Sequence, residues 1–235
     1  MVPYRFGKES YNVDYPNLTQ YADLIDIVKN DNSFYEYYSV QRSQRPDNLS
    51  QELYGTPNYH WTFFLLNDHI REAGWPLDEY LLEKKIQTNH PNTVIQTTDD
   101  LIGHFLVGDK IKGFTSAQAR TIIKRNLDLG QIFVEGTNPF VDGELITTVE
   151  VDNPTTITCL NALDEYLAAV YYTNVAGDEI IDIDPLSGPG SAVPITYDEY
   201  YRSRNDDLKQ IRVIKPLAIS RIVDEFERVM KNVSS

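Results

Sequence analysis

The sequence contains a single cysteine, Cys159, and this scarcity excludes two kinds of structure. One thiol cannot form an intramolecular disulfide, and it cannot supply the sulfur ligands of a cysteine-based zinc site. Histidine is also scarce, and His60, His69, His90 and His104 show no metal-site spacing such as H-E-x-x-H. We therefore expect a fold without a disulfide, a bound metal or a cofactor.

Basic residues and long apolar runs are lacking as well. The chain has 21 Lys and Arg against 35 Asp and Glu, a net charge of −14. Such a field repels phosphate backbones and anionic membrane surfaces, so neither nucleic acid nor membrane is an expected partner. No stretch approaches the roughly 20 apolar residues of a membrane span. The start, Met1 to Arg5, lacks the apolar segment of a signal peptide, so we expect a cytoplasmic protein unless an assembly carries it elsewhere.

Motifs for catalysis or calcium binding are also missing. The G-x-S-x-G motif is absent, and the Gly/Pro/Ser stretch at 187–191 lacks the strand–turn–helix context of a nucleophile. The acidic run Asp178, Glu179, Asp182 and Asp184 lacks the Gly and Glu positions of an EF-hand loop, so a solvated strand face is the better interpretation. The sequence thus predicts no enzyme.

Tyrosine, in contrast, is abundant, with 16 Tyr beside only 2 Trp. Its large ring and hydroxyl suit half-buried and interface positions. The composition therefore favours a protein that makes extensive contacts with partners.

Helix and strand signals divide the first part of the chain. Apolar spacing predicts an amphipathic helix over 17–28, and alternating aromatics predict a strand over 35–40. Pro46 is suited to the first position of a helix, and Gly55 to its C-terminal stop. Leu49 should lie on the apolar face of that helix.

A second helix should follow at once. Thr56 can cap it, Trp61 belongs to its largely apolar surface, and Asn67 ends it before a further strand. Trp75 precedes a proline that opens another helix, reaching about Lys85. We expect both tryptophans in the core, and the inward-facing residues of the later helix to be Leu77, Tyr80 and Leu81.

The middle of the chain carries a short internal repeat. Segments 105–111 and 140–146 both have the form F-x-x-G-acid-x-I, in which the glycine marks a turn or bulge. Strands are expected over 121–124 and 131–134. We interpret residues 100–158 as a small antiparallel β-module.

The last third predicts a hairpin and two helices. The β-rich runs 168–173 and 179–184 form the hairpin, and Thr196 with Glu199 forms a capping box for a helix. A strand over 211–214 precedes the final helix, whose apolar stripe should pack on that strand. Its opposite, charged face is a candidate interface, represented by Arg221, Glu225 and Arg228.

Two blocks of sequence carry a resemblance. The first contains Arg45-Pro46-Asp47-Asn48-Leu49, Leu53-Tyr54-Gly55, Tyr59-His60-Trp61, Asn67-Asp68 and Gly74-Trp75-Pro76. The second contains Ile195-Thr196, Tyr200, Asn205 and residues 209–216. In this order the blocks, which span about half of the chain, resemble the T4-type phage baseplate wedge subunit family, whose members carry a LysM-like N-terminal segment.

The resemblance implies an α+β fold: a LysM-like strand–helix–helix–strand N-terminal part, a small antiparallel β insertion, and a C-terminal hairpin with helices. The expected domains are 1–99, 100–158 and 159–235. The structural anchors of the LysM-like part would be Leu49, Tyr54, Gly55, Trp61 and Trp75.

The resemblance also implies a function. Such a subunit links neighbouring wedge proteins around the hub of a contractile tail by protein–protein contacts. Its partners would be other wedge proteins and hub or sheath-initiator proteins of the same virion, with several copies in each baseplate. The expected location is therefore the virion.

A LysM-type module that binds cell-wall glycan is the alternative hypothesis. LysM domains bind N-acetylglucosamine polymers beside their strand–helix and helix–strand loops. The corresponding candidates in this chain are Arg45, Pro46, Asn67 and Asp68. These residues also serve to start or end helices, and the C-terminal block has no counterpart in wall-binding modules. The structural subunit is the preferred hypothesis.

Overall fold

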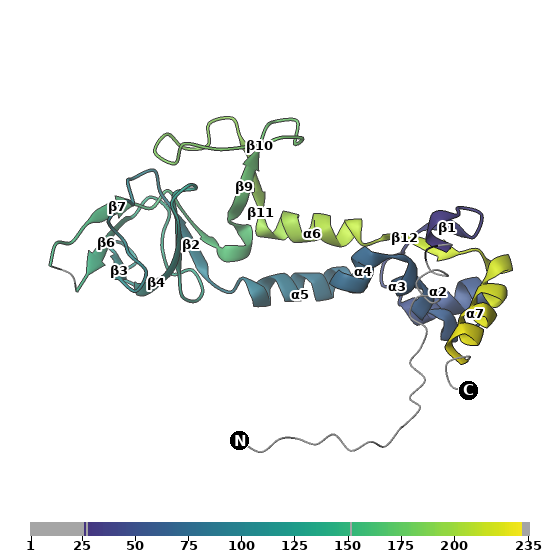
Figure 1. Cartoon of the computed structure of the whole chain (residues 1–235). Coiled ribbons are helices and arrows are strands. Elements are labelled where there is room, and N and C mark those ends of the chain that lie inside the picture. Colours follow the sequence, from purple (N-terminus) through teal and green to yellow (C-terminus); the bar gives the residue numbers. More distant parts are fainter. Residues whose placement is uncertain (1–25, 27, 151, 232–235) are drawn as a thin grey trace, which may run out of the picture. The chain divides into compact units, whose positions relative to one another are not determined.

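The computed structural model describes residues 26, 28–150 and 152–231, with the backbone alone over 229–231 (Figure 1). The chain divides into two compact units: unit 1 comprises Met1–Pro76 with Asp206–Ser235, and unit 2 is Leu77–Asn205. This division differs from the three consecutive domains expected, because segments from both ends of the chain fold together. The helix predicted over 17–28 lies outside the described residues except for its last few positions.

Among the described residues, all paired strands are antiparallel, and no parallel crossover unit connects them. The α+β class predicted from the sequence is confirmed at this level. None of the described helices has the length and hydrophobicity that crossing a bilayer requires.

Unit 1 is built on a two-stranded sheet whose strands come from opposite ends of the chain. Strand β1 (Tyr35–Ser39) pairs with β12 (Gln210–Ile214), with Tyr35 opposite Ile214 (Figure 1). The sequence predicted instead a strand soon after Asn67, but those residues form a helix. The helical elements of the unit whose bounds the structure gives are α2 (Pro46–Tyr54), η1 (Pro57–Tyr59), α3 (Trp61–Leu66), α4 (Asp68–Ala73) and α7 (Pro216–Lys231).

The boundaries of α2 follow the predicted signals. Pro46 occupies the first turn, and Gly55 ends the helix in the left-handed conformation with φ 73°. The helix expected after Thr56 is divided in two, however. The Thr56 hydroxyl accepts a hydrogen bond from Asn58 N at 3.3 Å and begins only the short turn η1, and α3 starts anew at Trp61.

The core of unit 1 joins helices from both segments to β12. As expected, the apolar stripe of α7 packs on this strand: Ile219, Ile222 and Val223 form one buried cluster with Ile214. Trp61 is half-buried beside this cluster, and its ring centroid lies 4.6 Å from that of Phe226.

A second buried cluster includes Ile211 and Val213 of β12. Phe63 and Leu49 are fully buried in it, and Trp75 packs half-buried against it, with its ring centroid 5.9 Å from that of Phe63. The ring of Tyr54 lies 6.0 Å from Phe63 on another side, and its hydroxyl donates to Ile214 O at 2.9 Å. Both tryptophans thus border the core and are not enclosed in it.

Unit 2 contains a seven-stranded antiparallel sheet with the order β7-β6-β3-β4-β5-β2-β8. It extends beyond the 100–158 interval of the expected β-module, because β2 and β8 lie outside that interval. The strands are β2 (Thr93–Gln96), β3 (Lys110–Gly113), β4 (Ala119–Asn126), β5 (Gln131–Val134), β6 (Leu145–Val149), β7 (Thr156–Thr158) and β8 (Asn161–Asp164).

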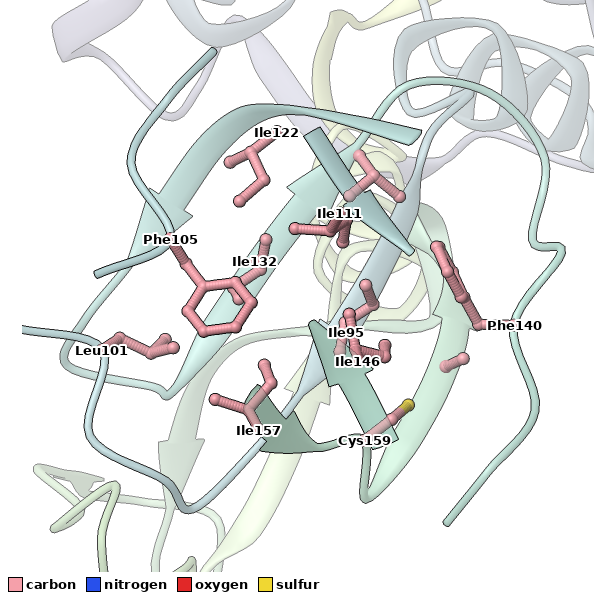
Figure 2. Close-up of a cluster of buried hydrophobic side chains, with 12 residues drawn as sticks. Ile95, Leu101, Phe105, Ile111, Ile122, Ile132, Phe140, Ile146, Ile157 and Cys159 are labelled. Atoms are coloured by element: carbon pink, nitrogen blue, oxygen red, sulfur yellow. The ribbon is translucent and has the colours of Figure 1, made fainter. Parts of the chain in front are cut away.

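This sheet curls around one core. Each of its seven strands contributes a side chain to a single buried cluster, which Figure 2 shows with Phe105 and Phe140 entering from the loops. The two ends of the strand order, β7 and β8, are also consecutive in the chain, so the sheet closes on itself through a short connection. Cys159 lies in that connection and is fully buried in the cluster.

The two copies of the internal repeat adopt the same turn. In the first, Leu106 N donates to the Asp109 carboxylate at 2.7 Å, and in the second Val141 N donates to Glu144 Oε1 at 2.7 Å. In both copies the acidic residue donates its own N–H back to the residue three positions earlier. The strands that follow the turns, β3 and β6, pair antiparallel. The sequence echo is therefore a structural repeat, in which an acidic side chain closes a turn before a strand.

Two helices and a smaller sheet complete unit 2. Helix α5 (Glu79–Asn89) begins later than predicted because Asp78 caps it by accepting from Leu81 N at 2.9 Å. Its buried residues are Leu82 and Ile86, whereas Tyr80 and Leu81, expected to face inward, are 72% and 48% exposed. The smaller sheet has the order β10-β9-β11, from β10 (Ile180–Ile181), β9 (Ala169–Thr173) and β11 (Val193–Thr196).

The capping box predicted for the next helix, α6 (Tyr197–Asp207), is confirmed. Thr196 N donates to Glu199 Oε2 at 2.9 Å, and Glu199 N donates to Thr196 Oγ1 at 3.2 Å. The predicted hairpin is present as β9 and β10, although β10 is only two residues long.

Candidate functional site

The strand–helix loop of unit 1 is held by a glutamine. Gln44 accepts from Gln41 N at 3.0 Å and donates to Glu52 at 2.8 Å, and its carbonyl accepts the indole N–H of Trp75 at 2.7 Å. Arg45 next to it points outward, with a side chain 74% exposed and paired to Asp47 at 3.1 Å. Of the glycan candidates, Arg45 and the half-buried Pro46 after it lie at the start of α2.

Asn67 lies at the other candidate loop, between α3 and α4, and it is buried. Its amide nitrogen donates to Phe63 O and to Arg212 O, both at 2.8 Å, and its oxygen accepts from Arg212 N at 2.8 Å. These three hydrogen bonds all lie within unit 1, and through them the Asn67 amide connects the end of α3 to β12. Both N–H donors of the side chain are used, and the amide is buried, so it is poorly placed to bind a ligand.

Asp68 follows Asn67 and is half-exposed. It forms ion pairs with Lys29 at 2.8 Å and Arg71 at 2.9 Å. The hydrogen bond from Lys29 is the main cause that lowers the pKa of the Asp68 carboxyl below its ordinary value. No hydrogen bond or ion pair between described residues joins this loop to Arg45 or Pro46.

The charged face of α7 is the second candidate surface. Arg221 is exposed, and Arg228 pairs with Glu225 three residues before it on the helix. Because Ile222 and Val223 on the opposite side belong to the core, this face is turned away from unit 1. Exposed ion pairs with a partner protein would each contribute only about 0–1 kcal/mol to the free energy of binding. Such a face would therefore determine how the two proteins align more than how tightly they bind.

Unit 2 contains a buried histidine–carboxylate pair that sequence patterns did not indicate. His90 Nδ1 lies 3.2 Å from Glu165 Oε1, and its ring packs in a tilted arrangement against Tyr197, with a centroid distance of 4.3 Å. Glu165 also accepts from the side-chain amide of Asn92 at 2.8 Å. These bonds tie the start of β2 to the turn before β9, so the pair has a clear role in folding.

The described part of the chain shows neither a reactive cysteine nor a metal-binding group. Burial, followed by the charges of Asp142 and Glu144, raises the pKa of the Cys159 thiol to about 12, so it carries no thiolate at neutral pH. Across the described ranges, no group of three or more His, Cys, Asp or Glu is arranged to hold a metal ion.

A groove of about 820 Å³ lies within unit 2, between the turn that joins β4 and β5, the loop after β2, and strands β9 and β10. The acidic run considered in the sequence as a solvated strand face contributes to it through Asp182 and Asp184, which follow the short strand β10. The other acidic residues come from distant stretches, which is why no sequence window indicated the groove. Its acidic lining residues are Asp99, Asp100, Asp128, Asp182 and Asp184.

Comparison with known proteins gives no relative: no protein-family model matches the chain, and a search of curated proteins finds no match.

Proposed function

We propose that this chain is a structural subunit of the baseplate wedge of a contractile-tailed phage, in which it links neighbouring proteins and catalyses no reaction. The pairing of β1 with β12 carries the proposal. Most of the first block of the resemblance and the 209–216 part of the second lie in unit 1, and this pairing joins them. Sequence similarity to one family on both sides of a long interruption is expected when the two flanks form one domain.

Unit 1 is then the LysM-like domain of the family. Helices α2 and α3 follow β1, as in a strand–helix–helix–strand arrangement, and β12 supplies the closing strand. The proposed insertion is consequently larger than the interval 100–158 and corresponds to unit 2, Leu77–Asn205.

The alternative, binding of cell-wall glycan by the same loops, is less well supported. The Asn67 amide is buried with both of its N–H donors used, and Asp68 is engaged by two cations. Polar groups that recognise a sugar must have donors or acceptors left for its hydroxyls. We therefore expect calorimetry with a chitin oligomer to show no micromolar binding, and such binding would favour the glycan hypothesis.

The direct test of the proposal is the protein composition of purified phage tails. Mass spectrometry of baseplates from the phage that encodes this chain should find it in several copies per particle. Absence of the chain from intact, infectious particles would refute the proposed function.

The contact surface can be tested without unfolding the protein. Deletion of the chain after Pro216 is unsuitable, because Ile219 and Ile222 belong to the core of unit 1. Reversal of two charges on the outer face, Arg221→Glu with Arg228→Glu, keeps that core intact. We expect this variant to be folded but poorly incorporated into baseplates.

The matched control is Lys84→Glu with Lys85→Glu, which makes the same change of charge on exposed positions of α5 in unit 2. Normal incorporation of the α7 variant, or an equal loss with the control, would show that the charged face of α7 is not a specific contact.

A further inference from the structure

The charged residues that line the groove of unit 2 are all acidic. Five of its described lining residues are aspartates and none is Lys, Arg or His. Within the described chain, none of the five forms an ion pair. A concave surface whose charged groups all have one sign concentrates the electric field inside it.

Three of the five aspartates form hydrogen bonds within the described part of the protein, and two do not. Asp100 accepts from Ile102 N at 2.7 Å and Asp184 from Leu186 N at 3.1 Å, so each of these closes a turn. Asp99 accepts from Thr158 N at 2.5 Å and connects the loop after β2 to β7. Asp128 and Asp182 make no hydrogen bond or ion pair with another described residue. Both are exposed and free to meet a partner.

The same groove exposes large apolar side chains. Ile102 is 72% exposed, Ile180 66% and Leu186 57%, and they are contributed by different loops and strands. Apolar groups in a water-filled groove gain free energy when a partner covers them. The occupant should therefore combine positive charge with apolar side chains.

Other cations and polyanions fit less well. These aspartates do not form a metal-binding group in the described residues. Nucleic acid would bring phosphates against them. A second copy of the chain carries a net charge of −14, so long-range repulsion opposes self-association through this surface.

We infer that the unit 2 groove binds a basic, apolar segment of a partner protein, with Lys or Arg side chains held by Asp128 and Asp182 and apolar side chains seated against Ile102, Ile180 and Leu186. This inference deepens the proposed function, because the identity of the partner as a neighbouring subunit of the assembly rests on that proposal. The groove itself is defined by unit 2 alone.

The test uses the full chain and a labelled synthetic peptide of six Lys-Leu repeats, with binding measured by fluorescence anisotropy. We expect the double variant Asp128→Asn with Asp182→Asn to weaken binding about five- to tenfold, since exposed charge pairs contribute modestly. Binding should also weaken as salt rises from about 50 to 500 mM, because exposed charges are screened.

Matched controls separate the groove from general attraction to an acidic protein. Glu135→Gln with Asp152→Asn removes the same charge from exposed positions of unit 2 that do not line the groove. Ile180→Ser should weaken binding, whereas Val175→Ser, at a position 79% exposed outside the groove, should not.

Several outcomes overturn the inference. No binding of the Lys-Leu peptide, equal loss in the groove and control variants, or equal binding of a Glu-Leu peptide would each exclude a specific basic partner. Sedimentation that reveals self-association abolished by the Asp128 and Asp182 changes would assign the groove to a second copy of the chain. If the chain is found in baseplates but its groove does not bind the peptide, the proposed function stands and only this inference is refuted.

Discussion

The two units are closed in different ways. Unit 1 becomes complete only when β12, near the end of the chain, pairs with β1 near its beginning. Unit 2 comes from one continuous stretch, and four of its eight described strand pairings join strands that follow one another in the chain. Their charges differ too: unit 2 holds 20 of the 35 acidic residues but only nine of the 21 Lys and Arg, a net charge of −11 that leaves −3 for unit 1.

This comparison shows how one chain can combine two kinds of surface. An inserted unit that folds from its own contiguous sequence need not contribute to the core of its host. Its surface is then free to carry most of the net charge, including the acidic groove. If the units are energetically separate, changes in one core should leave the other intact.

The largest expected effects come from matched core truncations. Phe63 in unit 1 and Phe105 in unit 2 are 0% and 1% exposed. Phe→Ala at such sites typically costs about 3–5 kcal/mol. Native-state hydrogen exchange should show faster exchange only in unit 1 for Phe63→Ala and only in unit 2 for Phe105→Ala. Equal acceleration throughout the protein by either variant would show that the two units unfold together as one body.

The next effect tests the closure of unit 1. Asn67→Ala removes an amide that joins α3 to β12 and leaves buried groups of Phe63 and Arg212 without partners. Unsatisfied buried groups cost about 1–3 kcal/mol each, so we expect a loss of about 2–3 kcal/mol in the free energy of unfolding, measured with urea. Asn58→Ala, at an exposed position, is the control and should change it by less than about 0.5 kcal/mol. Similar stabilities for both variants would mean that the bridge is dispensable.

Within unit 2, Glu144 gives a smaller, pH-dependent effect. Burial raises the pKa of its carboxyl, but hydrogen bonds from Ser116, Val141 and Thr115 outweigh burial and bring the pKa below its ordinary value of 4.5. Because the folded pKa is the lower one, the stabilisation is full above about pH 4.5 and is lost as pH falls through the folded pKa. Glu144→Gln should therefore cost about 2 kcal/mol at pH 7, and progressively less in acid.

The internal repeat offers the control for this prediction. Asp109 closes the equivalent turn but accepts one hydrogen bond, from Leu106 N, so Asp109→Asn should cost only about 1 kcal/mol. Urea unfolding from pH 3 to 7 would compare the two variants. A cost for Glu144→Gln that stays constant over this range would contradict a stabilisation by the ionised carboxylate.

The features that the sequence predicts correctly are local ones. Pro46 and Gly55 limit α2, and Thr196 with Glu199 starts α6, because each signal acts within one turn of the helix. A competing local signal defeats such a prediction, as Asp78 does by capping α5 after the expected start. The strand that pairs with β1 is distant in sequence, so no local signal identifies it. For the same reason, nothing near Asn67 in the sequence indicates that its amide bonds to β12.

For the candidate sites too, the sequence predicts positions along the chain but not contacts between distant segments. The loops around Arg45 and Asn67 were predictable as positions on the chain, but the burial of Asn67 depends on β12, which is 145 residues away at Arg212. The groove joins Asp100, Asp128 and Asp182 from three separate stretches, and each stretch alone has the appearance of a solvated surface. Only the tertiary fold brings these charges to one concave surface.

The smallest effect expected is at the capping box of α6. Thr196→Ala removes a hydroxyl that accepts from Glu199 N at 3.2 Å, and loss of such a cap typically costs about 1 kcal/mol. Because the cap serves one helix of unit 2, we expect faster hydrogen exchange in the first turn of α6 and no change in peptides from unit 1. Ser203→Ala, at an exposed position of the same helix, supplies the control and should leave exchange unaltered. Faster exchange in β1 and β12 after Thr196→Ala would show that the stability of unit 1 depends on the insertion, and the two units could then no longer be treated as separate.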